Sequence, residues 1–422
     1  MKNIYNDMKL SKHRQSFHNK RVLVIGSGAV GTHLMEKLVK MGVSPDAIDL
    51  DYFTLENAAK HSCLVRTPED VGKNKAVCTS ERVQPLLDEG CTSNGIDADI
   101  CKLGPEAFAD YDYVIVAVDN NAAKVLLNEL IRQLPEDRRP IVIVDGTYGE
   151  MASSVILDNK DFCIRCLLDE TWLKDSAVKT SCVGPQIREI DGVNEIIRTS
   201  NCASSMAAHL SCEQFRGNVL GYDNVMNRRV IYTAYPNLEL GCSHPMRKKN
   251  CPGCAIKAHE DIRWLHGSVL DLTLKETLEQ IGKCLGTRDF ELSAHRLNYK
   301  NTVYAGFIVD DVCHSCGKPI KVMRHEGRLF LNDLLCDECS AKGSKAHHDP
   351  EFKHGTKVLA FSLDSDKDLQ DRTLYDLGYP LGAHIEVIQR NDALDFLDDG
   401  ITKAIFAFDE DHTKMHEIHK LL

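Results

Sequence analysis

The sequence predicts an α/β protein with a doubly wound, Rossmann-like sheet, zinc-binding elements and a small C-terminal α+β unit. An apolar run at residues 22–25 leads into a glycine-rich turn, strand-like and helix-like patterns alternate up to residue 160, and four Cys-x-x-Cys pairs follow. Such alternation is typical of parallel sheets whose strands are joined by helices.

The glycine-rich turn has the G-x-G-x-x-G spacing, formed by Gly26, Gly28 and Gly31. We expect a helix over Thr32–Met41, and a second apolar run then leads to Asp51. Glycines permit close approach of the backbone to a phosphate, and the amides at a helix N-terminus face it. Asp51 lies 20 residues beyond Gly31, where its carboxylate is able to bind a ribose. This stretch predicts a nucleotide site rather than a simple packing turn.

Charged residues follow the predicted strands at the expected carboxyl edge of the sheet. The later strands are predicted at Tyr113–Val118 and Ile141–Val144. Ligands of open α/β sheets bind beyond such strand ends. Lys73 and Arg66 offer positive charge for phosphates, and Asp119 offers a carboxylate for Mg²⁺. The set suits attack on a nucleoside triphosphate; the simpler interpretation is that Lys73 is a solvated turn residue and Asp119 a helix N-cap.

Composition narrows the class of protein. The 422 residues suffice for two or three domains, and the net charge of −11 argues against broad nucleic-acid binding. No apolar run approaches the ~18 residues that span a bilayer, and residues 1–20 have no signal-peptide core. We therefore expect a cytoplasmic protein that binds neither nucleic acid nor membranes.

The 17 cysteines are explained largely by their spacing. An odd total and close pairing argue against a disulfide framework, and four thiolates around a tetrahedral zinc fit better. The pairs are Cys163/Cys166, Cys251/Cys254, Cys313/Cys316 and Cys336/Cys339. Four sulfur ligands leave no open position for water, so we expect structural zinc.

Three regions are expected along the chain. Residues 1–267 form the nucleotide domain with the first zinc site, and residues 268–340 form a helix and a zinc-ribbon-like insertion with the second. A polar linker, 340–355, separates these from a small α+β domain at 356–422.

The ordered motifs resemble those of the ThiF/MoeB/ubiquitin-activating enzyme superfamily, over about residues 10–260. The motifs are Gly26/Gly28/Gly31, Asp49-Leu-Asp51, Glu56-Asn57, Asp70-Val-Gly-Lys73 and Val118-Asp119-Asn120. Members adenylate the C-terminal glycine carboxylate of a ubiquitin-like β-grasp protein, using ATP and Mg²⁺. The first domain would then be an adenylation domain.

The resemblance implies roles for individual residues. Asp51 would hold the ribose, Asn57 and Lys73 the phosphates, and Asp119 the Mg²⁺. In His13-Arg14-Gln15, Arg14 would reach into the partner's ATP site of a homodimer. The nucleotide-binding set implied by the resemblance and the charge pattern is Gly26, Gly28, Gly31, Asp49, Asp51, Asn57, Lys60, Arg66, Lys73, Asp119 and Asn120.

The sequence departs from the family pattern at residues 56–61. The usual S-N-L-N-R-Q is replaced by E-N-A-A-K-H, so Lys60 and His61 stand for Arg and Gln. Lysine does not form the bidentate phosphate contact of arginine. We therefore expect Arg66 or Arg14 to carry more of the phosphate binding.

The first two cysteine pairs resemble the family's split structural zinc site, whereas the family motif does not require the second site. Members that pass on their cargo carry a thioester-forming cysteine in the following crossover segment. Cys182, near Lys179, is our candidate for this catalytic nucleophile. Cys202, at an expected helix start, is the second candidate, and the absence of any thioester is the third.

We therefore expect an enzyme that adenylates a ubiquitin-like protein, forms a thioester with it and transfers it to a conjugating enzyme recruited by a ubiquitin-fold-like C-terminal unit. A bacterial ubiquitin-like conjugation system is one such pathway. The alternatives are a sulfur-carrier adenylyltransferase of thiamine or molybdopterin synthesis, a zinc-containing NAD dehydrogenase and a non-catalytic scaffold. For the C-terminal unit, a generic cap or dimerisation module is the other interpretation.

Overall fold

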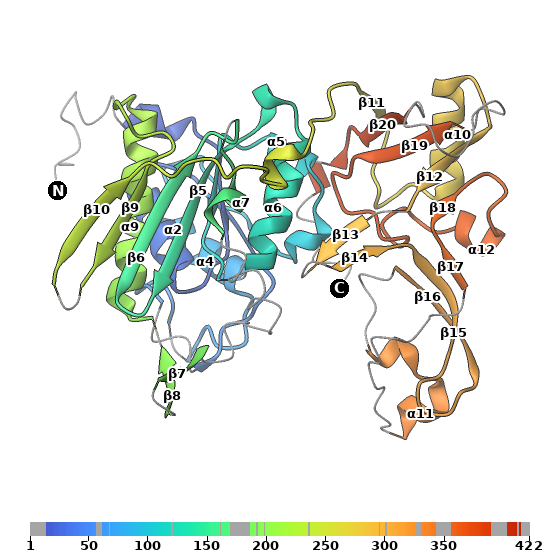
Figure 1. Cartoon of the computed structure of the whole chain (residues 1–422), viewed down its shortest axis with the longest axis horizontal. Helices are drawn as coiled ribbons and strands as arrows, with labels where there is room; N and C mark the ends of the chain where they lie inside the picture. Colours follow the sequence, from blue (N-terminus) through green and yellow to red (C-terminus); the bar gives the residue numbers. More distant parts are fainter. Residues whose placement is uncertain are drawn as a thin grey trace. The chain divides into compact units, whose positions relative to one another are not determined.

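The computed structural model forms two compact units, which we describe separately (Figure 1). Unit 1 comprises residues 1–100, 108–258 and 415–422, and unit 2 comprises 101–107 and 259–414. The structure describes residues 14–55, 61–66, 68–119, 121–160, 162–168, 186–190, 193–197, 199–234, 237–294, 296–299, 302–325, 331–342, 356–389, 403–411 and 413–414.

Unit 1 is built on an eight-stranded sheet with the order β10-β9-β6-β5-β4-β1-β2-β3. The strands β1 to β5 pair in parallel, whereas β6, β9 and β10 extend the sheet in antiparallel fashion. Their bounds are β1 Val22–Ile25, β2 Asp46–Asp49, β3 Gly95–Asp97, β4 Tyr113–Val116, β5 Ile141–Tyr148, β6 Met151–Leu157, β9 Arg229–Thr233 and β10 Glu239–Ser243. The predicted α/β class with a parallel sheet is confirmed, and the antiparallel extension was not anticipated.

Helices cover both faces of this sheet. α2 contacts both α4 and α9, which places these three helices on one face, and α6 packs with α7. The apolar side chains of α2 are buried in the core of unit 1, as Leu34, Met35 and Leu38 show. The bounds are α2 Ala29–Met41, α4 Lys75–Val83, α6 Asn121–Gln133, α7 Ile164–Leu167 and α9 Asn201–Val219; a separate hairpin is formed by β7 Gln186–Ile190 and β8 Val193–Ile197.

Unit 2 contains a five-stranded sheet with the order β11-β20-β19-β12-β18. It joins strands that precede residue 294 to strands that follow residue 356. The bounds are β11 Ile262–Leu265, α10 Leu274–Leu285, β12 Phe290–Ser293, β18 Ala360–Phe361, α12 Lys367–Gln370, β19 Ile385–Gln389 and β20 Lys403–Phe408. The domain limits expected from the sequence remain predictions. The strands of this sheet come from all three expected regions, because β11 precedes residue 268, β12 lies within 268–340 and β18, β19 and β20 follow residue 356.

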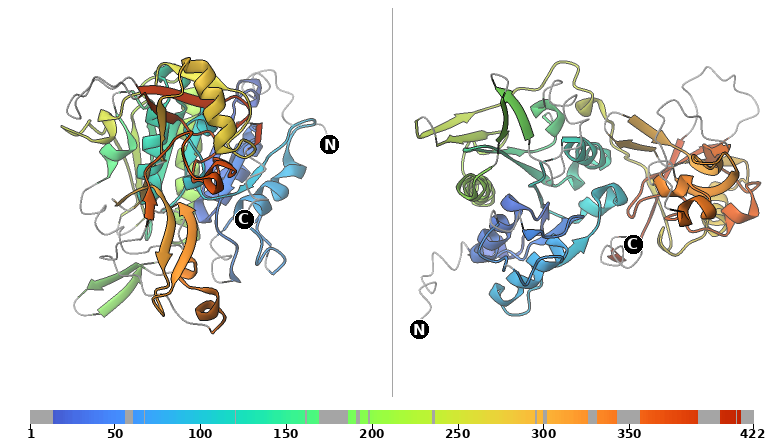
Figure 2. Two further views of the ribbon diagram at one scale, coloured as in Figure 1. Left: turned by 90° about the vertical axis from the view of Figure 1, so that its right-hand side faces the viewer. Right: turned by 90° about the horizontal axis from the view of Figure 1, so that it is seen from below.

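A second sheet of unit 2, ordered β16-β15-β17, carries α11 at its far end (Figures 1 and 2). Gly306, at a φ of +124°, separates β14 from β15, whereas the apolar pattern of the sequence predicts one continuous strand over Thr302–Val309. The expected strand Arg328–Leu331 lies largely outside the described residues, and Leu331 begins a 3₁₀ helix. The bounds are β13 Arg296–Tyr299, β14 Thr302–Ala305, β15 Phe307–Val312, β16 Pro319–His325, η6 Leu331–Leu334, α11 Asp337–Ala341 and β17 Thr356–Val358.

The segment 101–107 belongs to unit 2 although it lies between β3 and β4 in the sequence. The Gly104 amide donates to Leu381 O (2.6 Å), and the Leu381 amide donates to Lys102 O (2.9 Å). A Cβ at Gly104 would lie 2.3 Å from Gly382 O, so only glycine permits this approach. The buried Glu106 and His384 side chains add a contact of 2.7 Å between Oε1 and Nε2. Sequence reasoning placed this segment with the nucleotide domain.

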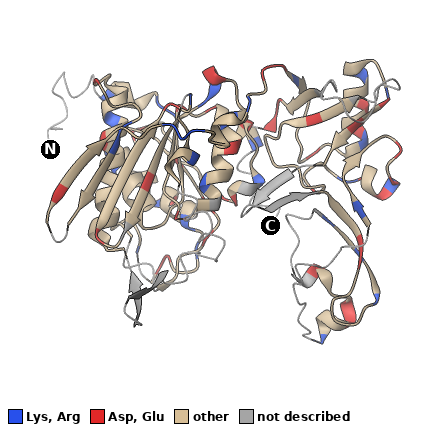
Figure 3. Cartoon of the chain, viewed as in Figure 1, with Lys and Arg blue, Asp and Glu red and all other residues tan. Residues whose placement is uncertain are grey.

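Charged residues are rare on the strands of the large sheet and frequent on helices and loops (Figure 3). Asp145 in β5 is an exception, with 4% of its surface exposed. Ser211 of α9 donates to Asp145 Oδ1 and lies 2.7 Å (Oγ to Oγ) from Ser154 of β6. Oδ2 has no hydrogen-bond partner among the described residues. Burial raises the pKa of Asp145 to about 8, so this carboxyl group is protonated near neutral pH.

The raised pKa of Asp145 predicts a pH-dependent stability. The folded chain holds this proton more tightly than the unfolded chain, so the contribution is fully present below pH ~4 and is lost as the pH rises through ~8. Between pH 6 and 8, the free energy of unfolding of the unaltered protein should fall by about 2 kcal/mol more than the free energy of unfolding of Asp145→Asn. Denaturant titrations of both proteins across this range measure it. If the difference in the free energy of unfolding between the two proteins does not change with pH, the raised pKa of Asp145 is contradicted.

Candidate nucleotide and metal sites

The glycine loop after β1 is held by close backbone contacts that only glycine permits. Gly26 has a φ of +92°, and a Cβ there would lie 2.8 Å from Ala117 O, beyond the end of β4. A Cβ at Gly31 would lie 1.9 Å from Gly26 O. The Gly26 amide donates to Ile48 O (2.8 Å), which ties the loop to β2. The loop therefore sits where the carboxyl ends of three neighbouring strands meet.

Helix α2 begins directly after this loop, three residues earlier than expected. Its N-cap is Gly28, which offers no side-chain oxygen, and its first turn holds no acidic residue. A Cβ at Gly28 would meet nothing within 4 Å. Open space thus adjoins Gly28 at the start of α2, where the free amides and the positive end of the helix dipole attract an anion.

Asp49 connects the glycine loop with Asp51. Its Oδ2 accepts the Ser27 amide (2.6 Å), and its Oδ1 accepts the Asp51 amide (2.9 Å). Burial raises the pKa of Asp49 to about 6, against the opposing effect of the nearby Lys75. Both oxygens of Asp49 thus bind backbone amides, while the Asp51 carboxylate lies 3.0 Å from Lys75 Nζ.

Asn74 organises the loop that carries Lys73, and sequence reasoning did not single it out. Its Oδ1 caps α4 by accepting the amides of residues 76 and 77. Its Nδ2 donates to Asp49 O (2.9 Å) and Asp97 Oδ1 (2.8 Å). An asparagine before a helical pattern is a cap signal, but its contacts with β2 and β3 depend on the fold.

Lys73 and Arg66 are both accessible from solvent. Lys73 Nζ lies 3.1 Å from Asp70 Oδ1, and the Lys73 side chain is 47% exposed. This hydrogen bond raises the pKa of Lys73 above its usual value. The Arg66 amide donates to Asp70 Oδ2 (2.7 Å), and its side chain is exposed.

Asp119 is exposed and follows the end of β4, where the Ala117 amide donates to Ile25 O (2.8 Å). The glycine loop and Asp119 thus lie beyond adjacent strands of the sheet. Burial lowers the pKa of Lys124 on α6, while the Asp119 and Asp145 carboxylates act in the opposite direction. Asn57, Lys60, Asn120 and Cys182, which we selected from sequence, lie outside the described residues.

Arg14 is bound within its own chain. Its Nη2 and Nε lie 2.6 and 3.1 Å from the two oxygens of Asp88. Its side chain covers Gly42, the left-handed residue that ends α2. No local pattern in the sequence indicates this pairing, whose two residues lie 74 positions apart.

Cys202 is exposed in the first turn of α9, two residues after the N-cap Ser200. The neighbouring Asn201 donates to His61 O (3.1 Å) and lies 3.3 Å from His33 Nε2. The start of α9 therefore lies beside α2 and beside His61, the last residue of the segment 56–61 that departs from the family pattern.

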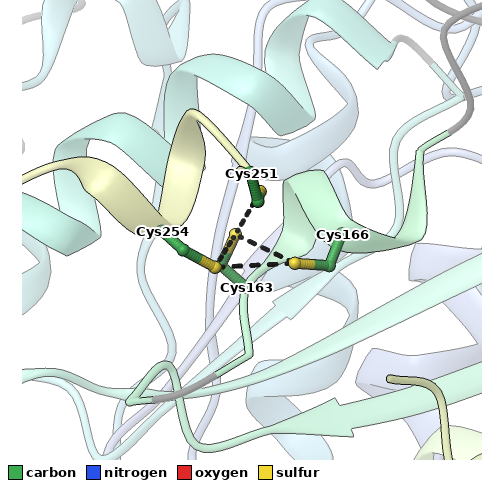
Figure 4. A group of neighbouring side chains, drawn as sticks. All are labelled: Cys163, Cys166, Cys251 and Cys254. Atoms are coloured by element: carbon green, nitrogen blue, oxygen red, sulfur yellow. Dashed lines mark hydrogen bonds between the residues drawn. The ribbon is translucent and has the colours of Figure 1, made fainter. Parts of the chain in front are cut away.

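The first four-cysteine group has the geometry of a tetrahedral zinc site (Figure 4). Its sulfur atoms lie 3.9 Å apart for Cys163/Cys166, 3.7 Å for Cys163/Cys251, 3.5 Å for Cys166/Cys254 and 3.3 Å for Cys163/Cys254. Zinc–sulfur bonds of ~2.3 Å place tetrahedral ligands about 3.8 Å apart. Burial raises the pKa of Cys254 to about 11 and that of Cys163 further. Four buried thiolates therefore need a bound cation.

Arg132 of α6 anchors both halves of this group. Its guanidinium donates to Cys254 O (3.2 Å) and to Asn159 O (2.6 Å), close to the first cysteine pair. Gly253 lies too close to Cys163 Sγ for a side chain, since its Cβ would stand 3.0 Å away. The site joins segments 88 residues apart.

The second group brings together Cys313, Cys316, Cys336 and Cys339, with all four sulfur atoms within 4.8 Å of one another. The Cys336 amide donates to Cys313 Sγ (3.2 Å) and lowers the pKa of Cys313 to about 6. Amide donors of this kind favour the thiolate that zinc requires. Both predicted cysteine groups thus fit zinc.

A third group that sequence reasoning missed lies on strand ends of unit 2. His266 Nδ1 stands 3.2 Å from Asp409 Oδ2, and its Nε2 stands 3.8 Å from Glu410 Oε1. The Asp409 hydrogen bond raises the pKa of His266. The side chains of this group are exposed to solvent, and we interpret the group as an ion pair of His266 with the two carboxylates.

The sequence profile of the ThiF family matches residues 5–312, so the chain belongs to the ThiF family. The resemblance inferred from the motifs is therefore confirmed. Among the described residues, no helix combines the length and apolar character that crossing a bilayer requires.

Curated relatives are similar to parts of the chain. The SUMO-activating enzyme subunit 2 of Dictyostelium discoideum is 29% identical over 149 residues, which are 35% of this chain and 22% of that protein. The NEDD8-activating enzyme E1 catalytic subunit of Caenorhabditis elegans is 27% identical, over 37% of this chain and 38% of that protein. The ATP-dependent ubiquitin transferase-like protein Cap2 of Vibrio cholerae is 25% identical, over 49% and 35% respectively. The chain thus spans less than two fifths of these relatives.

Among solved structures, a crystal structure of E. coli MccB with ATP is 17% identical with a TM-score of 0.45. The match covers 58% of this chain and 69% of that one.

The two glycine positions predict stability losses of very different size. Gly31→Ala should lower the free energy of unfolding by more than about 3 kcal/mol, because its Cβ would overlap Gly26 O. Gly28→Ala should cost about 1 kcal/mol or less, because its Cβ enters open space. Urea denaturation of both variants measures the contrast, and equal losses would refute the close contact.

The two cysteine groups predict about two zinc ions per chain, measured by elemental analysis. Chelation should lower the melting temperature, because metal binding contributes folding free energy. Cys166→Ser and Cys339→Ser should each remove one ion, and Cys284→Ser, at an exposed cysteine on α10, is the matched control. Full zinc content in either ligand variant would refute that site.

Proposed function

We propose that this ThiF family member activates the C-terminal carboxylate of a ubiquitin-like β-grasp protein by adenylation with ATP and Mg²⁺. One observation carries the proposal: in this family member the start of α2, which has no side-chain cap, directly follows the glycine loop, and Asp49 at the end of the neighbouring β2 binds the amides of both Ser27 and Asp51. The relatives named as SUMO- and NEDD8-activating enzymes support a protein substrate.

The proposed chemistry divides the work among these groups. The α2 amides, Lys73 and Arg66 would bind phosphate oxygens, Asp51 the ribose, and Asp119 the Mg²⁺. A carboxylate oxygen of the cargo attacks the α-phosphorus of ATP, and pyrophosphate leaves as the bond to its bridging oxygen breaks. Positive charge around the phosphates stabilises the charge that develops in this step. Asn57, Lys60 and Asn120 complete the proposed nucleotide set.

A thioester step follows in the proposal. The Cys182 thiolate attacks the acyl carbon of the adenylate, AMP leaves, and the cargo then passes to a conjugating enzyme. Cys202 is the alternative nucleophile. Direct handover of the adenylate, as by a sulfur-carrier adenylyltransferase, needs neither cysteine.

We also propose that the chain acts as a homodimer in which Arg14 serves the partner's ATP site. This role requires Arg14 to leave Asp88, which binds it within the chain. Membership of the ThiF family leaves the dehydrogenase interpretation without support, and the retained Lys73 and Asp119 oppose the scaffold interpretation.

The adenylation site is tested by ATP–pyrophosphate exchange in the presence of a ubiquitin-like protein that ends in glycine. Lys73→Ala and Asp119→Ala should each reduce exchange by on the order of 10²-fold or more, because they remove charge that stabilises the transition state. Lys40→Ala, at an exposed ion pair on α2, is the matched control. Near-normal exchange in folded Asp119→Ala would refute the Mg²⁺ assignment.

The nucleophile is tested by trapping the covalent cargo adduct. Cys182→Ala should still form the adenylate but no thiol-sensitive adduct, while Cys202→Ala should form both, because only the nucleophile carries the acyl group. Gel electrophoresis with and without reducing agent measures the adduct. Its persistence in Cys182→Ala would transfer the role to Cys202. The absence of any adduct in the unaltered protein would favour direct handover.

A further inference from the structure

The two four-cysteine groups differ in how far solvent reaches their sulfur atoms. All four cysteines of the first group are buried, with exposed fractions between 0% and 8%. In the second group, Cys313 and Cys339 are buried, but Cys316 is exposed and Cys336 is half-buried. These two accessible ligands are neighbours, with 3.7 Å between their sulfur atoms. A small oxidant can therefore reach two adjacent sulfur atoms of the second group, whereas burial protects those of the first.

Ligation by zinc makes the accessible cysteines chemically reactive as well. The thiolate, and not the thiol, is the nucleophile in oxidation, and solvent exposure decides which thiolates react. A cysteine that binds zinc is deprotonated. Cys316 and Cys336 thus combine thiolate character, access from solvent and a second sulfur within 3.7 Å. This combination is what formation of a disulfide requires.

The end of the ribbon that carries the second group has few other contacts to hold it together. Its buried cluster consists of Cys313, Leu334, Leu335 and Cys339, with Ile320 and Cys336 packed against it. Half of these residues are zinc ligands, so the metal contributes much of the folding free energy of this end, which includes α11 (Figure 1). The first group is held in addition by Arg132, which binds the backbone of both its halves.

We propose that Cys316 and Cys336 form a site of reversible oxidation, at which a peroxide converts two zinc-bound thiolates into a disulfide. The second zinc ion is released in this reaction, and the first zinc ion stays bound. The inference rests on the assignment of zinc to the second group and is independent of the proposed adenylation.

The reaction balances with one hydrogen peroxide for each disulfide. The Cys316 sulfur attacks a peroxide oxygen, the O–O bond breaks, and the hydroxide that leaves takes up a proton to form water. The Cys336 sulfur then attacks the sulfenic acid at Cys316, so that the S–O bond breaks, the S–S bond forms and a second water leaves after protonation. The two sulfur atoms lose two electrons, which the peroxide gains. Cys313 and Cys339 remain as ligands, too few to retain the ion.

The test treats the full, zinc-loaded chain with hydrogen peroxide and follows zinc release with a chromogenic chelator. One ion should leave at least about tenfold faster than the other, because exposure governs the oxidation of thiolates. Tandem mass spectrometry of a non-reduced digest should show a disulfide between Cys316 and Cys336. A sample without peroxide gives the background release. Equal release rates for both ions, or release without this disulfide, would overturn the proposal, as would a second group that holds no zinc before oxidation.

Variants identify the ion that is released. Cys166→Ser, which lacks a ligand of the first site, should still release zinc rapidly, whereas Cys339→Ser should not. Cys284→Ser, at an exposed cysteine on α10, is the matched control and should behave as the unaltered protein does. Rapid release from Cys339→Ser would contradict the assignment. The mass-spectrometric result needs no variant and decides the outcome even if a ligand variant fails to fold.

Reversibility is tested on the oxidised protein. A thiol reductant followed by one equivalent of zinc should restore the original zinc content, because a disulfide is reducible whereas a sulfinic acid is not. Permanent loss of the second ion would contradict a reversible site.

Discussion

The architecture of unit 1 depends on the backbone contact between Gly31 and Gly26. A Cβ atom at residue 31 would lie 1.9 Å from Gly26 O. The first turn of α2 therefore approaches the loop more closely than any residue other than glycine would permit at this position. The contact brings α2 directly onto the end of β1 and leaves its first amides facing open space beside Gly28. If the loop were longer or bulkier, the helix dipole and the strand ends would not converge on one ligand.

Carboxylates then hold this arrangement by binding donors of the protein itself. Asp49 binds two amides, and Asp70 binds Arg82, Lys73 and the Arg66 amide. Asp145 in the core is protonated instead, because burial outweighs its single hydrogen bond to Ser211. The pKa values of these three aspartates thus differ, because the fold supplies each carboxyl group with a different number of hydrogen-bond donors. The first four-cysteine group needs a cation for the same reason, since burial disfavours the thiolates of Cys163 and Cys254.

Unit 2 is assembled from segments that are distant in the sequence. Its five-stranded sheet combines strands before and after the second cysteine group, and the segment 101–107 joins it through Gly104 and Leu381. Truncation at residue 356 would remove β18, β19 and β20 and leave β11 and β12 without partners. Point variants are therefore the sounder probes of this unit.

The sequence by itself determined the elements whose signals are local. The G-x-G-x-x-G turn, the strands that lead to Asp51 and Asp119, and the four Cys-x-x-Cys pairs follow from residue type and spacing, because glycine conformation, apolar periodicity and thiolate coordination act over short ranges or through recognisable motifs. The joining of the first two pairs in one site was implied by the family resemblance. Only the tertiary structure decided that β6, β9 and β10 extend the sheet, that Asp88 binds Arg14 and that Asp70 takes the fork of Arg82. Those partners lie on different elements, and no periodicity along the chain encodes which buried carboxylate will meet which cation once the strands have paired.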